Sequence, residues 1–253
     1  MTNSQSKNYL LSVNMSENKE ITQIYRNMWQ GASPLLARNE ILIDPYLSGR
    51  TDTRRGITLL IRITSPVSES IQKFLAEVSQ VEPGQYAYPS SDLHVTVMSV
   101  LSCIEDYTLA GESEDAYIDL IRPIVANTPP FSIEFSGLTL SESGIVLCGY
   151  PSNNSLNQLR DQLRQHITKS ALPHSMDARY TLITAHSTVL RFKQRLQDPD
   201  KLLMFLANNR ERHFGQLRVR NMALVVNDWY QSQSTTVLMD TLALKPAQSS
   251  IKV

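Results

Sequence analysis

Two short strings of one type constrain this chain more than any other feature. The sequence contains His-Val-Thr-Val at residues 94–97 and His-Ser-Thr-Val at residues 186–189, which start 92 residues apart. Each string lies in an apolar, β-branched run, at about 93–101 and 182–192, which is typical of a β-strand. Side chains two positions apart project from the same face of a strand. Each strand is therefore expected to present one imidazole and one hydroxyl on one face, with the valines on the other.

The elements predicted around these strands repeat in order along the chain. In each half, a helix precedes the histidine strand, and a second helix and a β-hairpin follow it. The first half has a strand at 56–64, a helix at 67–80, the strand at 93–101, a helix at 113–126 and strands at 131–140 and 145–150. The second half has a helix at 152–168, the strand at 182–192, a helix at 200–209 and strands at 216–227 and 235–245. Hairpins favour antiparallel sheets, so we expect an α+β fold with two similar lobes.

Three segments are expected along the 253 residues. Residues 1–55 form an amino-terminal extension with a helix at about 17–30, residues 56–245 hold both histidine strands, and residues 246–253 form a tail. The chain has no apolar run of about 18 to 20 residues and no apolar core of a secretion signal, so we expect a cytoplasmic protein without a membrane partner. Cys103 and Cys148 occur in apolar runs and are expected to be buried thiols.

The charge of the chain limits its partners. The 24 basic and 24 acidic residues cancel, whereas proteins that bind long nucleic acid need a broad basic surface. A long duplex is therefore disfavoured, and a small or short anionic substrate remains possible. Arg54 and Arg55, just before the first predicted strand, are expected to be solvated charges.

The paired strands indicate a kind of chemistry. If the two lobes pack with their histidine faces across a groove, then His94, Thr96, His186 and Thr188 converge on a volume that suits a tetrahedral phosphate. One imidazole could act as a base and the other as an acid. Metal binding by the two histidines is an alternative, but no third ligand is visible at a suitable spacing. The sequence also lacks a glycine-rich phosphate loop, a CxxC pair and an HExxH motif, so neither a metal nor a cofactor is expected.

At these residues the chain resembles the 2H phosphoesterase superfamily, which is named for a pair of H-x-[ST]-hydrophobic motifs and includes the 2′-5′ RNA ligase and cyclic phosphodiesterase group. The resemblance spans about 56–245. The second motif continues to Leu190 and Arg191, which gives the H-x-T-hydrophobic-x-Arg form common in that group. The resemblance implies a bilobal fold with pseudo-twofold symmetry, both motifs lining a central cleft, and a metal-free phosphoesterase activity.

Arg191 presents a geometric difficulty. The resemblance implies that it contacts phosphate, yet it lies an odd number of residues from His186, so a regular strand would place it on the opposite face. A β-bulge or the end of the strand would have to bring it back; a structural role or a surface ion pair is the alternative.

Five aromatic residues in loops are candidates for stacking on a base or sugar. They are Tyr86, Tyr88, Tyr180, Trp229 and Tyr230. Each could equally be a hydrophobic cap of its turn.

Three functions remain open at this stage. The first is a phosphodiesterase that acts on a cyclic phosphate or a 2′-5′ linkage of a nucleotide or RNA end. The second is a catalytically inactive module of the same fold that binds nucleotides or RNA ends, and the third is a zinc-dependent hydrolase. The sequence leaves open the natural substrate, the choice between ligation and hydrolysis, the assignment of acid and base, and any protein partner.

Overall fold

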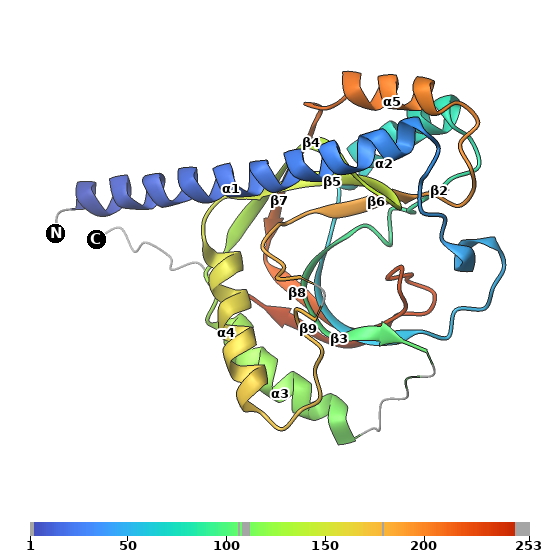
Figure 1. The fold of residues 1–253 in the computed structure, drawn as a ribbon. Helices are drawn as coiled ribbons and strands as arrows, with labels where there is room; N and C mark the ends of the chain where they lie inside the picture. Colours follow the sequence, from blue (N-terminus) through green and yellow to red (C-terminus); the bar gives the residue numbers. More distant parts are fainter. Residues whose placement is uncertain (1–2, 106, 108–111, 179, 246–253) are drawn as a thin grey trace.

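The computed structural model describes residues 3–105, 107, 112–178 and 180–245 (Figure 1). The predicted tail at 246–253 lies outside these residues. Of the side chains at the start of the first helix, up to residue 17, nothing is described.

Two antiparallel sheets form the centre of the molecule (Figure 1). The first sheet has the strand order β3 (His94–Ile104), β1 (Arg55–Arg62), β8 (Asn221–Asn227) and β9 (Val237–Ala243). The second has the order β2 (Tyr86–Ala87), β6 (Ser187–Arg191), β5 (Gly144–Pro151), β4 (Phe131–Ser141) and β7 (His213–Val219). The predicted α+β class with two similar antiparallel sheets is confirmed.

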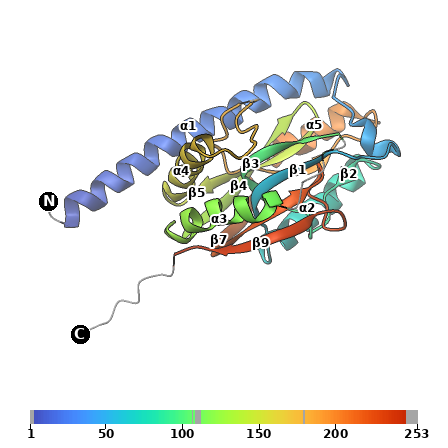
Figure 2. The ribbon, with the colours of Figure 1, turned by 90° about the horizontal axis from the view of Figure 1, so that it is seen from below.

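The helices lie in two groups on the outer sides of the sheets (Figure 1). The group next to the second sheet comprises α1 (Asn3–Ala37), α2 (Val67–Val81) and α5 (Pro199–Asn208), and the group next to the first sheet comprises α3 (Glu112–Ala126) and α4 (Ser155–Lys169). Figure 2 shows that α1 runs along the side of the molecule and extends beyond the sheets at its amino-terminal end. This helix is longer than the helix predicted at 17–30.

The apolar stripes that predicted the helices are buried in the structure. In α2 the stripe packs Ile71, Phe74 and Val78 into the core. Helix α5 begins at a side-chain cap, because the Asp198 carboxylate accepts a hydrogen bond from the Lys201 amide, which satisfies a donor that the first turn leaves unpaired.

The two sequence halves do not form separate sheets. The histidine strand of the first half, β3, lies in one sheet with β8 and β9 of the second half, whereas the first half's hairpin, β4 and β5, lies beside β6. Each sheet therefore combines a histidine strand from one half with a hairpin from the other.

Two predicted strands were wrong in extent. The strand at 216–227 is split at Arg220 into β7 and β8, because the chain passes from the second sheet to the first. The strand at 182–192 is reduced to β6, which starts one residue after His186. The short strand β2 lies where a loop was predicted. It pairs antiparallel with β6, so that Tyr86 lies opposite Arg191 on the neighbouring strand.

Candidate active site

The first histidine strand contains a β-bulge. Successive residues of β1 pair with Thr96 and Met98, which leaves Val97 as an extra residue in β3. An extra residue shifts the alternation of side chains by one position. Val95 and Val97 are fully buried, while His94, Thr96 and, after the bulge, Ser99 are partly exposed on the other face.

The second histidine strand has its bulge at the equivalent place. Successive residues of β5 pair with Thr188 and Leu190, which leaves Val189 as the extra residue of β6. The bulge brings Arg191 to the face that carries Thr188 and, just before the strand, His186. The geometric difficulty of the odd spacing is thus removed by a bulge.

The residues on these two faces line one cavity of about 250 Å³. His94, Thr96, His186 and Thr188 all line it, together with Arg191. Of the predicted aromatic contacts, three line the cavity: Tyr88, Tyr180 and Trp229. Tyr180 is 63% exposed, so it lies at the open side.

Tyr86 and Tyr230 are not among the residues that line the cavity. Their rings lie 5.8 Å apart by centroid, and the Tyr86 ring meets the Tyr88 ring edge-on at 5.3 Å. These two tyrosines therefore form a layer beside the cavity wall and support Tyr88.

The His94 ring is held at Nδ1. This nitrogen lies 2.7 Å from the backbone oxygen of Asp92, and a carbonyl only accepts hydrogen bonds, so Nδ1 is the protonated nitrogen. Nε2 is left for a substrate. Burial lowers the His94 pKa to about 4; the hydrogen bond to Asp92 acts in the opposite direction, and the charges of Arg62 and Arg191 lower the pKa further.

The His186 ring is held in the same way by a different group. Its Nδ1 lies 2.7 Å from the Thr184 hydroxyl, which can donate or accept. Burial lowers the His186 pKa to about 4, and the charge of Arg160 contributes in the same direction. Both supporting residues, Asp92 and Thr184, stand two positions before their histidine. The Thr184 hydroxyl at this spacing is a signal that the sequence analysis missed, whereas Asp92 acts through its backbone oxygen, which any residue would supply.

Arg191 is positioned by aromatic residues. Its Nε donates a hydrogen bond to the Tyr88 hydroxyl at 2.9 Å, and its guanidinium carbon lies 5.8 Å from the ring centroids of both Trp229 and Tyr230. A guanidinium stacked on rings is held in one orientation, so Arg191 offers a fixed positive charge to the cavity.

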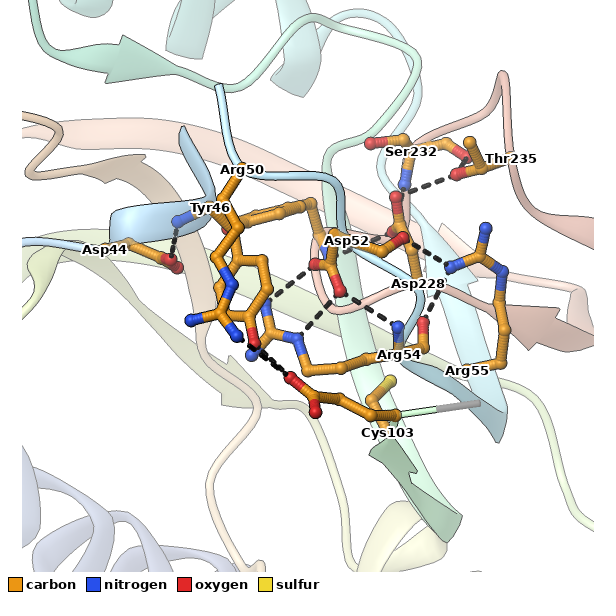
Figure 3. A network of polar contacts seen from close by, with 12 residues as sticks. Asp44, Tyr46, Arg50, Asp52, Arg54, Arg55, Cys103, Asp228, Ser232 and Thr235 are labelled. Atoms are coloured by element: carbon orange, nitrogen blue, oxygen red, sulfur yellow. Dashed lines mark hydrogen bonds and ion pairs between the residues drawn. The ribbon is translucent and has the colours of Figure 1, made fainter. Parts of the chain in front are cut away.

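The prediction that Arg54 and Arg55 are solvated was wrong. Arg54 binds the Asp52 carboxylate through Nε and Nη2, at 2.8 and 2.7 Å (Figure 3). The guanidinium carbon of Arg54 lies 4.0 Å from the Tyr46 ring centroid and 4.9 Å from that of Trp229. The Arg54 side chain is only 16% exposed. Arg55 is half-buried and donates to the backbone oxygens of Asp52 and Arg54.

These contacts attach the amino-terminal extension to the cavity rim. Tyr46 belongs to the 3-10 helix η1 (Pro45–Ser48) of the extension, and Trp229 lines the cavity. The loop that carries Trp229 is fixed from inside by Asp228, whose carboxylate accepts from the Ser232 amide and the Thr235 hydroxyl (Figure 3). The extension therefore packs against a wall of the cavity.

Cys103 also lines the cavity, and burial raises its pKa to about 11, so the thiol is protonated at neutral pH. Burial likewise raises the pKa of Cys148 to about 12. Among the residues that the structure describes, no three His, Cys, Asp or Glu side chains gather at a spacing that could hold a metal ion. Nor does any helix in the described ranges have the length and apolarity needed to cross a membrane.

Two antiparallel sheets with a His-x-Thr pair on facing strands define a 2H phosphoesterase fold. The model of the 2′-5′ RNA ligase superfamily matches residues 67–230, and the chain belongs to this superfamily. No curated protein matches the sequence.

Solved structures show the same fold. The protein TT0787 of Thermus thermophilus is 14% identical with a TM-score of 0.53, and the match covers 75% of this chain and 98% of that one. Escherichia coli LigT complexed with 3′-AMP is 16% identical with a TM-score of 0.52, and the match covers 76% and 99% of the two chains. A protein described as a phosphoesterase is 17% identical with a TM-score of 0.51, with coverage of 76% and 99%.

Proposed function

We propose that this protein cleaves a cyclic phosphate or a 2′-5′ phosphodiester of a nucleotide or RNA end, with His94 and His186 as the proton-transfer groups and without a metal or cofactor. One observation carries the proposal: two imidazoles, each held at Nδ1, border one small cavity together with two threonine hydroxyls and an arginine. The 3′-AMP bound by the LigT structure supports a nucleotide as the substrate class.

The two hydrogen bonds at Nδ1 suggest different roles for the rings. Because Asp92 offers only a carbonyl, the neutral His94 ring presents an unprotonated Nε2, which suits a base. The Thr184 hydroxyl can accept a hydrogen bond from Nδ1 of a protonated His186 as well as donate one to Nδ1 of the neutral ring. His186 can therefore hold the extra proton that an acid gives up at Nε2.

In hydrolysis of a 2′,3′-cyclic phosphate, His94 takes a proton from water while the water oxygen forms a bond to phosphorus. The bond from phosphorus to the ribose oxygen breaks, and His186, which is protonated in the substrate complex, gives its Nε2 proton to that oxygen. Thr96 and Thr188 donate hydrogen bonds to the non-bridging oxygens, and Arg191 adds a charge-assisted contact. In ligation a ribose hydroxyl takes the place of water and loses its proton to His94; in the reverse reactions, which re-form the cyclic phosphate, the two histidines exchange roles.

The lowered pKa values make proton transfer depend on the substrate. With pKa values of about 4, both rings are neutral in the empty cavity at pH 7. A bound phosphate anion favours the protonated imidazole and raises its pKa. The acidic limb of kcat, which reports the complex, is therefore expected at a higher pH than that of kcat/KM, which reports the free protein.

A substrate panel tests the proposal. Purified protein is assayed with 2′,3′-cyclic mononucleotides and 2′-5′ oligoadenylates, with and without EDTA, and with His186→Ala as the control. We expect turnover that EDTA does not change and that His186→Ala lowers at least about a hundredfold. Nucleotide binding without turnover would instead identify a binding module, and activity that follows stoichiometric zinc in elemental analysis would identify a metal-dependent hydrolase.

A further inference from the structure

Helix α4 carries an arginine where its apolar stripe predicts a hydrophobic residue. Arg160 is fully buried, in line with Leu156 and Leu163 on the inner face of the helix. Burial of a charge costs several kcal/mol unless hydrogen bonds or an opposite charge compensate for it. No ion pair is found for Arg160 within the described part of the chain, so its hydrogen bonds must explain its position.

The Arg160 guanidinium binds backbone oxygens of a strand in the first sheet and of the segment that leads into the second sheet. Its Nε donates to Val97 at 2.9 Å, and its Nη2 donates to Thr96 at 3.0 Å and to Thr184 at 2.8 Å. Nη1 lies 3.3 Å from the Asn157 side-chain oxygen. Thr96 and Val97 belong to β3 of the first sheet, whereas Thr184 lies in the segment just before β6 of the second sheet. One planar group therefore ties the two histidine strands together.

The bound oxygens lie directly behind the cavity. Val97 is the bulge residue, which falls outside the regular pairing with β1, and a bulge disrupts the local ladder of hydrogen bonds. Arg160 donates to this residue. On the second strand, Arg160 binds the oxygen of Thr184, whose hydroxyl contacts His186. Arg160 thus binds two residues of the first histidine motif directly and the residue two positions before the second histidine.

We propose that Arg160 is a positioning residue, which fixes the separation of the two histidine strands and the orientation of the His186 ring through Thr184. The inference rests on the proposed function, because it assigns Arg160 to the geometry of that same cavity. A lysine cannot replace the guanidinium, since three backbone oxygens require several donors in a planar fork.

The charge of Arg160 also acts on His186, whose pKa it lowers. The charged or titratable groups that act on Arg160 are Arg164, Asp177, Tyr25 and Tyr180. Those that act on His94 are Arg62, Arg191 and His186 itself. Removal of the Arg160 charge is therefore expected to raise the pKa of His186 more than that of His94.

The test compares Arg160→Lys and Arg160→Met with the wild type. We expect kcat to fall about ten- to a hundredfold in both variants, with KM changed less than about threefold, because proton transfer depends more steeply on the placement of the two strands than phosphate binding does. The control is Arg122→Met. It removes an exposed arginine of the neighbouring helix α3 whose carboxylate partners, Asp119 and Asp240, do not line the cavity, and its kcat is expected to stay close to that of the wild type.

A second measurement does not depend on activity. NMR titration of the imidazoles in the free protein should show a raised His186 pKa in Arg160→Met and a smaller change in Arg160→Lys, which keeps the charge. If both variants retain wild-type kcat and both histidine pKa values stay unchanged, the proposal is wrong. A wild type without turnover contradicts the proposed function alone, since the titration still tests the link to His186. If Arg160→Met does not fold, the kcat of Arg160→Lys decides whether the proposal holds.

Discussion

The two histidine strands, β3 and β6, are built alike but supported differently. Each has a polar residue two positions before the histidine, a threonine two positions after it and a bulged valine one position further on. The differences lie at two places. Nδ1 of His94 faces a carbonyl and Nδ1 of His186 a hydroxyl, and five positions after the histidine stands Ser99 in one strand and Arg191 in the other.

This difference shows how a symmetric scaffold can support an asymmetric reaction. Hydrolysis of a phosphodiester needs a base on one side of phosphorus and an acid on the other. The paired backbones supply two equivalent positions, and the supporting side chains make them unequal. Variants of the two histidines and of their supporting residues therefore test whether the two strands contribute unequally to the reaction.

The largest effect is expected from His94→Gln and His186→Gln. Each should lower kcat at least about a hundredfold, because each removes one proton-transfer group. A substrate with a nitrophenol leaving group separates the two roles, since such a leaving group needs little protonation. With that substrate His186→Gln should recover part of its kcat, while His94→Gln should not.

His213→Gln serves as the control. His213 is 61% exposed and does not line the cavity, so kcat should not change. Full activity in His94→Gln would contradict the paired site. Equal recovery of both variants with the nitrophenyl substrate would contradict the assignment of acid and base.

The sequence predicted the feature that the two strands share, a histidine and a threonine on one face, better than the features in which they depart from a regular strand. Strand parity placed His94 with Thr96 and His186 with Thr188 on one face, and all four line the cavity. A bulge in the second strand was one of two ways in which Arg191 could reach the face of Thr188. Its place at Val189 and the bulge at Val97 could not be predicted, because both are ordinary strand residues whose register depends on the neighbouring strands.

Long-range contacts explain most of what else was missed. Asp52, only two residues before Arg54, is a local partner that the prediction of a solvated Arg54 overlooked. The aromatic partners Tyr46 and Trp229 belong to other elements and leave no local signal. The exchange of hairpins between the sheets leaves no local signal, since hydrophobic alternation is the same in either sheet. Arg160 did leave a signal, because it is a charge at a position of the apolar stripe of its helix.

A smaller effect is expected at the fifth position after each histidine. Arg191→Gln should raise KM about tenfold, because a charge-assisted hydrogen bond to phosphate is lost. Ser99→Ala should change KM less than about twofold, since a neutral hydroxyl contributes less. Steady-state kinetics with one cyclic nucleotide compares the two variants directly. If Ser99→Ala raises KM as much as Arg191→Gln, the two strands hold the phosphate equally and the proposed inequality fails at this position.

The smallest effect is expected in the stability of the protein against acid. Both histidine pKa values are lowered from 6.5 to about 4, so between these pH values the unfolded chain binds more protons than the folded one. The free energy of unfolding must therefore fall as the pH falls from about 6.5 to 4. Full desolvation would contribute about 3 kcal/mol for each histidine, but both rings border an open cavity, so we expect about 1 kcal/mol for each.

Urea unfolding at pH 7.5 and 4.5 measures this term in the wild type, His94→Gln and His186→Gln. Each variant should lose less stability on acidification than the wild type does. Burial is the largest cause of both pKa shifts. If the two variants reduce the loss of stability on acidification by the same amount, burial in the common cavity is what makes the protein acid-sensitive. The individual charges differ, because Arg62 and Arg191 act on His94 while Arg160 acts on His186. A larger change in one variant would therefore show that these arginines, rather than burial, make the two histidines unequal. A variant as acid-sensitive as the wild type would show that its histidine is not desolvated.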